Sequence, residues 1–478
     1  MKRLLIFLVP VLLLASCAKN LEEYNVDQKN PQTVSASSLF SNAIKAFSDN
    51  QATPSVNINN FRFWTQQWAA TTYQDEPRYD ITSRNIPLNY WTPFYREVLQ
   101  DLNEARKITD ADPVLTPEVK ANRIAQIEIM AVYTWSVLVN TWGDVPYTEA
   151  LDININRPKY DSAAEIYADL FKRLDAALAQ LTPTNATFGS ADLIYGGNAA
   201  SWIKFGHSLK MKLAITVADA DEATARAAIQ ASFDKGFTSN ADNAIFEYQG
   251  STPNNNPISN NLNPILTSRQ DYVAGRTLVD KMNAKNDPRR PFYFTTVNGA
   301  FLGGAQGVNN SFADLSKPAD RIIETDFPAV LLDYSEVEFI LAEAAARWGI
   351  AGSPATHYNN AITASITYWG GSSDAVAADA AAYLLRPEVA YATATGDYRQ
   401  KIGEQKYIAL YNRGYDAWTE WRRLDYPRLQ PANEARSAIP LRITYVTSEY
   451  TLNRANVDAA ASALGGDDVE KKIFWDKF

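Results

Sequence analysis

Cysteine is almost absent from this sequence, because Cys17 is the only one among 478 residues. A single thiol cannot close an intramolecular disulfide, and it cannot build a metal site made of several cysteines. Histidine is also scarce, with only His207 and His357. Neither histidine has a nucleophile motif near it in the sequence, so the pattern does not indicate serine-triad catalysis.

Basic residues are fewer than acidic residues in this sequence. Long apolar runs are also lacking, because none follows residue 14. The chain has 45 Lys and Arg against 54 Asp and Glu, a formal net charge of −9. An acidic chain argues against nucleic acid or an anionic lipid surface as the ligand. The glycine cluster at residues 303–307 lacks the lysine of a phosphate loop and the strand–helix setting of a dinucleotide site.

The one long apolar run lies at the N-terminus. Two basic residues at positions 2 and 3 precede an apolar stretch at residues 4–14, and two small residues follow. This order is typical of a secretory signal peptide, and the run is about half of the ~20 residues that a membrane-spanning helix needs. The sequence LASC, ending at Cys17, resembles the bacterial lipobox, in which the cysteine thiol is lipidated and the peptide is cut before it. An unmodified cysteine in an ordinary leader is the alternative.

We therefore predict a signal peptide at residues 1–16, a lipidated Cys17 with a flexible tether at residues 17–38, and a single domain at residues 39–478. Several acyl chains on one cysteine would anchor the protein stably, whereas one chain binds membranes only marginally. Loss of the leader removes two positive charges and leaves a formal charge of −11. With Cys17 lipidated, no thiol remains for catalysis or metal binding.

Hydrophobic periodicity indicates helices through most of the domain. Ser162 and Glu165 form a capping box before apolar residues at spacings of three and four up to residue 181. Further helices are expected at residues 39–47, 61–71, 95–108, 124–142, 202–217, 335–348, 358–369 and 402–411. Short strands are expected only at residues 244–248, 292–297 and 443–446. Helices in pairs with long irregular loops indicate a mainly α, helical-repeat scaffold that carries a loop-built face.

Several segments, in order along the chain, resemble the SusD/RagB family of outer-membrane lipoproteins. They are NTWGDVPY at residues 140–147, the YD and IY pairs at 160–161 and 166–167, DLIYGGN with WIKF at 192–205, VEFILAE at 337–343, QK at 405–406, AW with EWRR at 417–423, IPLR at 439–442 with Glu449 and Asn453, and WD at 475–476. His207, Tyr407 and the Met211–Lys212 pair depart from the usual family pattern, at positions expected to lie in the core or on helix faces.

The resemblance implies a tetratricopeptide-like scaffold and a protein without catalytic activity. It implies a lid over a TonB-dependent outer-membrane transporter of the SusC type, to which the lid delivers captured oligosaccharide or peptide. The expected location is the outer membrane of a Gram-negative bacterium, lipid-anchored and exposed at the cell surface. No cofactor is expected, and a calcium ion held by loop oxygens would leave no clear trace in the sequence.

Sugar capture needs flat apolar rings flanked by groups that form hydrogen bonds. Residues 72–93 contain three prolines and little periodicity, which predicts a loop, and in the family such loops form the binding face. The first candidates for ligand binding are Tyr73, Asp75, Arg78, Tyr79 and Trp91. The further candidates, in the middle of the chain, are Asn254, Asn255, Asn256, Arg269, Asp271, Tyr272, Tyr293, Phe301 and Asn309.

Each aromatic candidate has core packing as its alternative, and Trp64 and Trp68 are expected in the core. Asp144 is expected to set a turn rather than to catalyse, because Gly143 ends a helix and Pro146 follows. The WRR segment at residues 421–423 is expected to pack its ring and pair its arginines with acids. A surface glycoside hydrolase, with two facing carboxylates about 5–9 Å apart, and an adhesin for proteins remain alternative functions.

Overall fold

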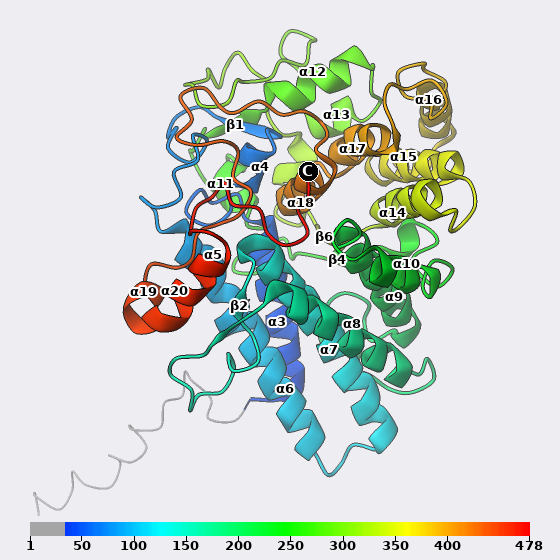
Figure 1. The fold of residues 1–478 in the computed structure, drawn as a ribbon. Coiled ribbons are helices and arrows are strands. Elements are labelled where there is room, and N and C mark those ends of the chain that lie inside the picture. Colours follow the sequence, from blue (N-terminus) through cyan, green and yellow to red (C-terminus); the bar gives the residue numbers. More distant parts are fainter. Residues whose placement is uncertain (1–33) are drawn as a thin grey trace, which may run out of the picture.

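Helices make up most of the computed structural model, which describes residues 34–478 (Figure 1). The fold is mainly α and tetratricopeptide-like, as predicted. The α-helices are α3 (Ala36–Ala52), α4 (Phe61–Trp64), α5 (Ile86–Pro93), α6 (Gln100–Ala111), α7 (Pro117–Trp142), α8 (Ala163–Gln180), α9 (Ala199–Thr216), α10 (Glu222–Gln230), α11 (Ser259–Leu262), α12 (Arg276–Ala284), α13 (Arg290–Tyr293), α14 (Tyr334–Trp348), α15 (Pro354–Gly370), α16 (Asp374–Leu384), α17 (Tyr398–Ala409), α18 (Gly414–Leu424), α19 (Glu449–Leu452) and α20 (Arg454–Ala463). Short 3-10 helices lie at Gly189–Ala191, Asn240–Asp242 and Asp320–Ile323, and a π-helix at Phe94–Leu99 joins α5 to α6.

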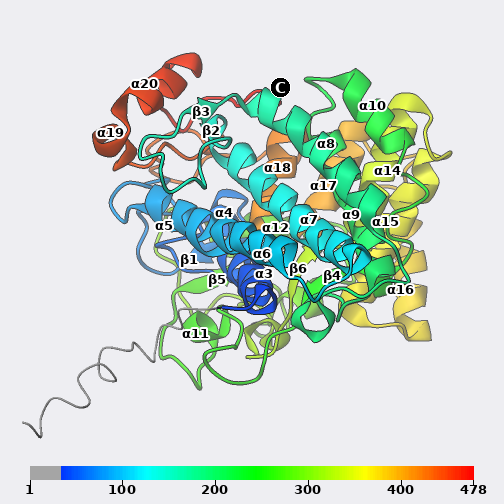
Figure 2. The ribbon, with the colours of Figure 1, turned by 90° about the horizontal axis from the view of Figure 1, so that it is seen from below.

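Neighbouring helices pack in pairs. The longest helix, α7, packs between α6 and α8, while α14 packs on α15 and α17 on α18. Figure 2 shows α6, α7 and α8 side by side, with α14 and α15 at the far end of the row. Helix α7 begins where the Thr116 hydroxyl caps Val119 N, and it ends at Gly143, whose φ of 86° a glycine adopts without strain.

The domain begins earlier than predicted. Helix α3 starts at Ala36, where the Ser35 hydroxyl caps Ser38 N, so residues 36–38 belong to the first helix and not to the tether. Cys17 and the predicted signal peptide lie outside the described residues.

Four of the sequence-based element predictions are wrong. The helix expected at residues 61–71 ends at Trp64, because Gln66 turns to a φ of 57° and strand β1 follows. The loop expected at residues 72–93 becomes helix α5 from Ile86, which has Pro87 in its first turn. Residues 292–297 contain the end of the short helix α13, and residues 443–446 form no strand.

The strands form three two-stranded antiparallel pairs. They are β1 (Trp68–Ala70) with β5 (Tyr272–Ala274), β2 (Val145–Pro146) with β3 (Tyr160–Asp161), and β4 (Ala244–Phe246) with β6 (Ala329–Leu332). In the first pair Ala70 lies opposite Tyr272, so the loop after β1 and the loop before β5 meet at the same end of the strand pair.

Two predictions for the family-like motifs are supported by local contacts. The Asp144 carboxylate accepts a hydrogen bond from Ala163 N at the start of α8, so it fixes a turn. Arg423 pairs with Glu343 of α14 at 2.6 Å and with Glu420, and all three side chains are buried. Arg422 differs from the prediction, because it donates to backbone oxygens and lies over the Trp418 ring, 3.4 Å from its centre.

Candidate functional site

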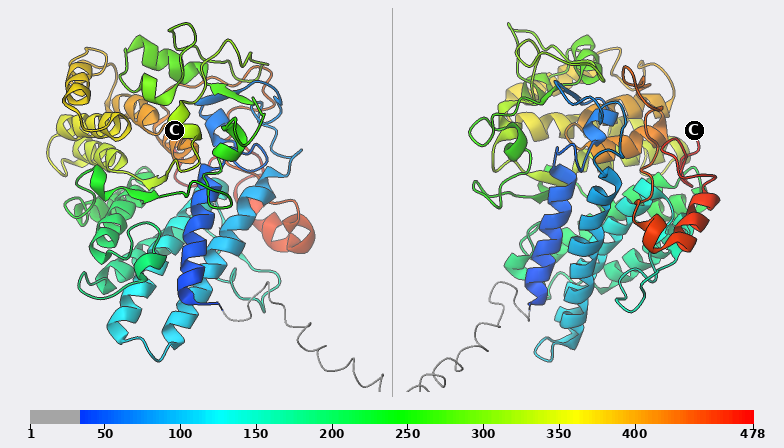
Figure 3. Two further views of the ribbon diagram at one scale, coloured as in Figure 1. Left: turned by 180° about the vertical axis from the view of Figure 1, so that it is seen from behind. Right: turned by 90° about the vertical axis from the view of Figure 1, so that its left-hand side faces the viewer.

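Long loops gather at the end of the molecule opposite the α6–α7 turn, near β1, α4 and α11 (Figures 1 and 3). The backbone ties these loops together. Thr71 N donates to Asp271 O at 2.9 Å, and the Asn310 amide donates to Ala70 O at 2.7 Å. Gly275 seals the junction, because a Cβ at this position would lie 2.1 Å from Gln66 O. Three chain segments that are distant in sequence therefore build one face.

A small concavity opens on this face beside Tyr73, and we call it the Tyr73 chamber. Its volume is about 200 Å³, and its lining residues are Ser55, Val56, Asn57, Tyr73, Arg84, Asn261, Arg269 and Tyr272. The Tyr73 side chain is 56% exposed, which is unusual for a large ring. The Arg84 guanidinium lies 5.7 Å from the centre of this ring, so one of its near neighbours is a cation.

A second concavity, the Phe312 chamber, shares Arg269 and Tyr272 with the first. Its volume is about 380 Å³, and its lining residues are Leu262, Pro264, Thr267, Ser268, Arg269, Gln270, Asp271, Tyr272, Thr295, Phe312, Lys317, Pro318, Asp320 and Ile323. Ile265, which is 89% exposed, and Leu266 stand on the neighbouring loop. We call the two chambers together the loop-face cleft.

Ion pairs hold the charged side chains of the cleft in place. Arg269 Nε donates to the Asp271 carboxylate at 2.6 Å, and this hydrogen bond raises the pKa of Arg269. Arg84 Nε donates to Glu76, whose side chain is fully buried. Burial raises the pKa of Glu76, while the Arg84 hydrogen bond opposes that shift.

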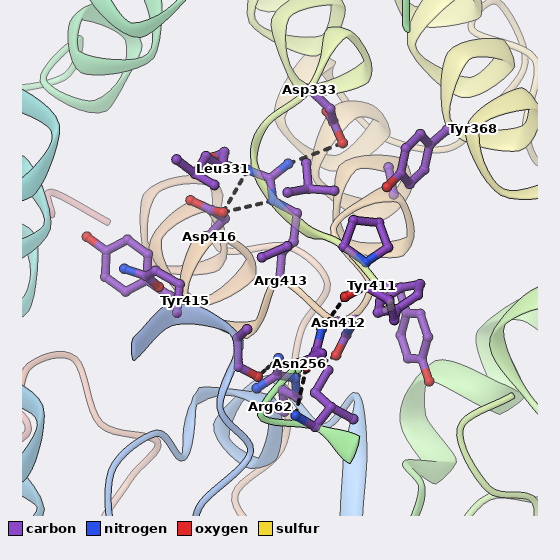
Figure 4. A pocket seen from close by; sticks show the side chains of 18 of the residues that line it. Arg62, Asn256, Leu331, Asp333, Tyr368, Tyr411, Asn412, Arg413, Tyr415 and Asp416 are labelled. Carbon is purple, nitrogen blue, oxygen red and sulfur yellow. Dashed lines mark hydrogen bonds and ion pairs between the residues drawn. The ribbon is translucent and has the colours of Figure 1, made fainter. Parts of the chain in front are cut away.

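Two other cavities fit an oligosaccharide less well. The first is a small space of about 50 Å³ beside Arg62 and Arg413, where Arg413 faces Asp333 and Asp416 (Figure 4). This volume holds a few water molecules and no sugar ring. The second is a wide groove of about 810 Å³ between α6, α7 and the loop at residues 147–154. Its tryptophan, Trp135, is buried, so no exposed indole face is offered there.

Comparison with known proteins identifies the family. The sequence matches, over residues 28–446, the SusD-like family described as "Starch-binding associating with outer membrane". The chain belongs to this SusD-like family. The match confirms the resemblance drawn from the sequence motifs and covers nearly the whole described domain.

Solved structures agree with the family assignment. A structure described as a chitin-binding protein has 24% identity and a TM-score of 0.80, with 93% of this chain and all of that chain covered. A chitin-binding SusD homolog from Flavobacterium johnsoniae has 23% identity and a TM-score of 0.77, with 92% and 98% covered. A SusD-like protein from Bacteroides thetaiotaomicron has 24% identity and a TM-score of 0.76, with the same coverage. At these identities the likeness establishes the fold. No curated protein sequence is significantly similar to the chain.

Four predicted ligand-binding rings of this SusD-like protein lie in the interior, so the expectation that they present a face to ligand is wrong. Tyr79 is 4% exposed and accepts a hydrogen bond from Ala432 N, and burial raises its pKa to about 12. Tyr293 is fully buried and stacks on Tyr411, with ring centres 4.2 Å apart. Trp91 stacks on Tyr95 at 4.6 Å.

Tyr272 is the fourth buried ring, and it still contributes to the cleft. Its hydroxyl donates to Pro54 O at 2.6 Å, and the ring packs against Phe63 and Trp68. It lines both chambers from below, so it shapes the floor of the cleft without offering an open face.

The polar candidates divide into two groups. Arg269 and Asp271 line the cleft. Asn309 is exposed, and its side-chain oxygen accepts a 3.4 Å contact from the Gln74 amide. Asp75 and Arg78 instead fasten the turn after β1 to the C-terminal loop, through Arg436 at 2.8 Å and Glu434 at 2.6 Å.

The mid-chain asparagines and Phe301 do not line either chamber. Asn255 and Asn256 are buried, and their side chains form hydrogen bonds inside their own loop and to Phe327 O. Asn254 is half-buried and donates to Gln249. Phe301 packs under the Arg290 guanidinium, 5.4 Å from the ring centre.

Sequence reasoning missed Asn57, Asn261, Phe312 and Lys317. Asn261 lies in the short helix α11, within a segment rich in Asn and Pro, and the sequence pattern does not distinguish it from its neighbours. Asn57 sits in a turn after α3, beside Ser55 and Val56 but far in sequence from Asn261, Arg269 and Tyr272, and only the fold brings these segments together at the cleft.

In the described part of the chain, neither a cluster of metal-ligating side chains nor a helix able to span a membrane is found. Within residues 34–478, no group of three or more His, Cys, Asp or Glu side chains is placed to hold a metal ion. Over the same residues, none of the helices combines the length and apolarity that crossing a bilayer requires.

Proposed function

We propose that this SusD-like protein captures oligosaccharides in the loop-face cleft at the cell surface. The observation that carries the proposal is the exposed Tyr73 ring, which stands beside the amides of Asn57 and Asn261 in a preformed concavity. A sugar presents an apolar C–H face to such a ring and hydroxyls to such amides. The family description and the names of the chitin-binding structures support a glycan over a peptide.

The cleft can accept more than one sugar unit. Its two chambers adjoin at Arg269 and Tyr272, and Phe312 offers a second half-buried ring in the larger chamber. The carboxylates that line the cleft are Asp271, which is paired with Arg269, and the exposed Asp320. We propose capture without hydrolysis, because glycoside cleavage needs two carboxylates that flank the bond and are free to act as acid and base.

The proposal is tested with soluble protein that lacks residues 1–17, on an array of neutral and acidic glycans and of peptides. Saturable binding of an oligosaccharide is the expected result, with no shortened products after long incubation. Binding confined to peptides would contradict the choice of ligand. Release of shorter glycans by the purified protein would instead favour a surface hydrolase.

We further propose delivery to a TonB-dependent, SusC-type transporter in the outer membrane of a Gram-negative bacterium, with Cys17 as the lipid anchor. The family description as associating with the outer membrane supports this location. The Cys17→Ser variant should appear in the soluble fraction, while the wild type should sediment with outer membranes and co-purify with the barrel. Membrane retention of Cys17→Ser would contradict the anchor, and isolation without a barrel would contradict the partner.

A further inference from the structure

The charged side chains that line the Tyr73 chamber are both cationic, although the protein is acidic overall with a formal charge of −9. Arg84 and Arg269 both line the chamber. Among the described residues that line it, the others are uncharged and no carboxylate occurs. The chamber therefore concentrates two guanidinium groups where the rest of the chain favours negative charge.

The acids that pair with these arginines are less exposed than the arginines themselves. The Glu76 side chain is completely buried, whereas its partner Arg84 is 35% exposed. The Asp271 side chain is 16% exposed, whereas Arg269 is 52% exposed. In each pair the guanidinium group is thus the more exposed member, and in the Tyr73 chamber, which Asp271 does not line, the cations are the charged groups that a ligand meets.

Each arginine is held through its Nε atom, which leaves the two Nη groups at the outer end of the fork. Arg269 Nε donates to Asp271, and Arg84 Nε donates to Glu76. One Nη group of Arg84 also approaches the Asn57 side-chain oxygen at 3.4 Å, a weak contact that a stronger acceptor could replace. A planar guanidinium with Nη groups available binds carboxylate or sulfate through two parallel hydrogen bonds.

We propose that the Tyr73 chamber selects an anionic sugar unit, one that carries a carboxylate or a sulfate group. The inference deepens the proposed function and rests on it. The sugar ring stacks on Tyr73, while its charged substituent is bound by Arg84 and Arg269. Neutral residues of the same glycan occupy the Phe312 chamber, so an acidic oligosaccharide binds more tightly than a neutral one of equal length.

Calorimetry on soluble protein lacking residues 1–17 tests the inference with hexasaccharide probes. The probes are oligogalacturonate, which has carboxylates, a sulfated galactan oligosaccharide without carboxylates, two neutral hexamers from chitin and starch, and hexaglutamate as an acidic peptide. We expect at least one acidic glycan to bind tenfold or more tightly than both neutral ones at low salt. The preference should shrink as salt is raised, because the chamber is partly exposed.

Arg269→Gln is the deciding variant, because it removes the exposed cation and leaves buried Glu76 paired with Arg84. It should weaken acidic-glycan binding about tenfold and change neutral-glycan binding less than twofold. Arg269→Lys keeps the charge but loses the forked guanidinium group, so its affinity for the acidic glycan should lie between that of the wild type and that of Arg269→Gln. Arg386→Gln is the matched control: Arg386 Nε also pairs with a carboxylate two residues on, Glu388 at 2.7 Å, and Arg386 lines neither chamber.

The outcomes separate the inference from the proposed function. Equal or tighter binding of the neutral hexamers, or an acidic preference that survives Arg269→Gln, overturns the anionic-sugar inference and leaves glycan capture intact. Binding of hexaglutamate with no binding of any glycan overturns both. Failure of every glycan and of hexaglutamate to bind overturns the proposed function as well.

Discussion

Replacement of Tyr73 by glycine should separate ligand binding from stability. Tyr73 has a φ of 56°, the left-handed conformation that a residue with a Cβ adopts at a cost of roughly 1–2 kcal/mol. Glycine removes this strain, but it loses more backbone entropy on folding, which offsets about 0.5–1 kcal/mol. Because the ring is 56% exposed, its removal sacrifices little packing. The free energy of unfolding should therefore stay the same or rise by about 1 kcal/mol.

Affinity for the oligosaccharide should fall in the same variant. The ring is the one large aromatic side chain exposed in the Tyr73 chamber, so glycine or alanine removes the stacking platform. A stacked aromatic contributes about 1–2 kcal/mol to binding, which corresponds to a loss of roughly 5- to 30-fold in affinity. Tyr73→Phe keeps the ring and should stay within about threefold of the wild type, allowing for one lost hydroxyl contact.

Calorimetric titration with the best-binding oligosaccharide measures the affinity, and thermal unfolding of the same samples measures stability. Tyr79→Phe serves as a matched control, since Tyr79 has a φ of 71° in the same loop but its ring is buried. It should lower stability, through the lost contact to Ala432 N, without changing affinity. The reasoning is refuted if Tyr73→Gly unfolds several degrees earlier than the wild type, or if it binds the glycan unchanged.

Three further variants test the scaffold. Burial raises the pKa of Asp476 to about 6, although the positive charges of Arg422 and Lys472 oppose this shift. Between about pH 4 and pH 6 the folded protein therefore keeps a proton that the unfolded chain releases, so the free energy of unfolding falls as the pH rises through this range. Asp476→Asn should raise the free energy of unfolding by about 1–3 kcal/mol at pH 7 and hardly at all at pH 3, as measured by urea denaturation; an equal gain at both pH values would contradict this. Arg423→Met removes the buried cation that Glu343 and Glu420 share and leaves them only Arg347 and Lys406, so it should cost about 3 kcal/mol in the same assay, and a loss below 1 kcal/mol would show that the remaining cations suffice. Gly275→Ala forces a Cβ against Gln66 O, so the free energy of unfolding should fall by about 2–4 kcal/mol, which thermal unfolding would show as a lower midpoint. Glycan binding should also weaken. Wild-type stability together with wild-type binding would refute the role of that junction.

The helical scaffold was predictable because its signals are local. Apolar spacing lies within one helix, as the stripe after Ser162 shows for α8; the predicted capping box is wrong, because Ser162 forms no side-chain capping hydrogen bond and Ala163 N donates to Asp144 instead. The motifs that resemble the family also predicted the order of the helices along the chain. The boundary errors arise where backbone conformation departs from the pattern, as at Gln66, whose positive φ ends α4 and starts β1.

Side-chain exposure in the loops was not predictable, because it depends on partners far away in sequence. Tyr73 and Tyr79 lie six residues apart in the same loop, yet one is exposed and the other is buried. The difference comes from Ala432, whose N–H binds the Tyr79 hydroxyl across 353 positions of sequence. Tyr293 is buried for the same kind of reason, since its hydroxyl donates to Ile408 O.

Trp68 shows that burial can be predicted when the local structure is not. It was expected in the core as part of a helix, and it is buried, but it lies in strand β1 opposite Ala274. Large apolar side chains are buried in either kind of element, so the hydrophobic pattern fixes burial more firmly than conformation.

A crystal structure of the protein with a bound oligosaccharide tests the central claim most directly. The account predicts a sugar ring against the Tyr73 face, within hydrogen-bonding reach of Asn57 or Asn261, and further units toward Phe312. Sugar density in the groove between α6 and α7, with the loop-face cleft empty, would contradict it.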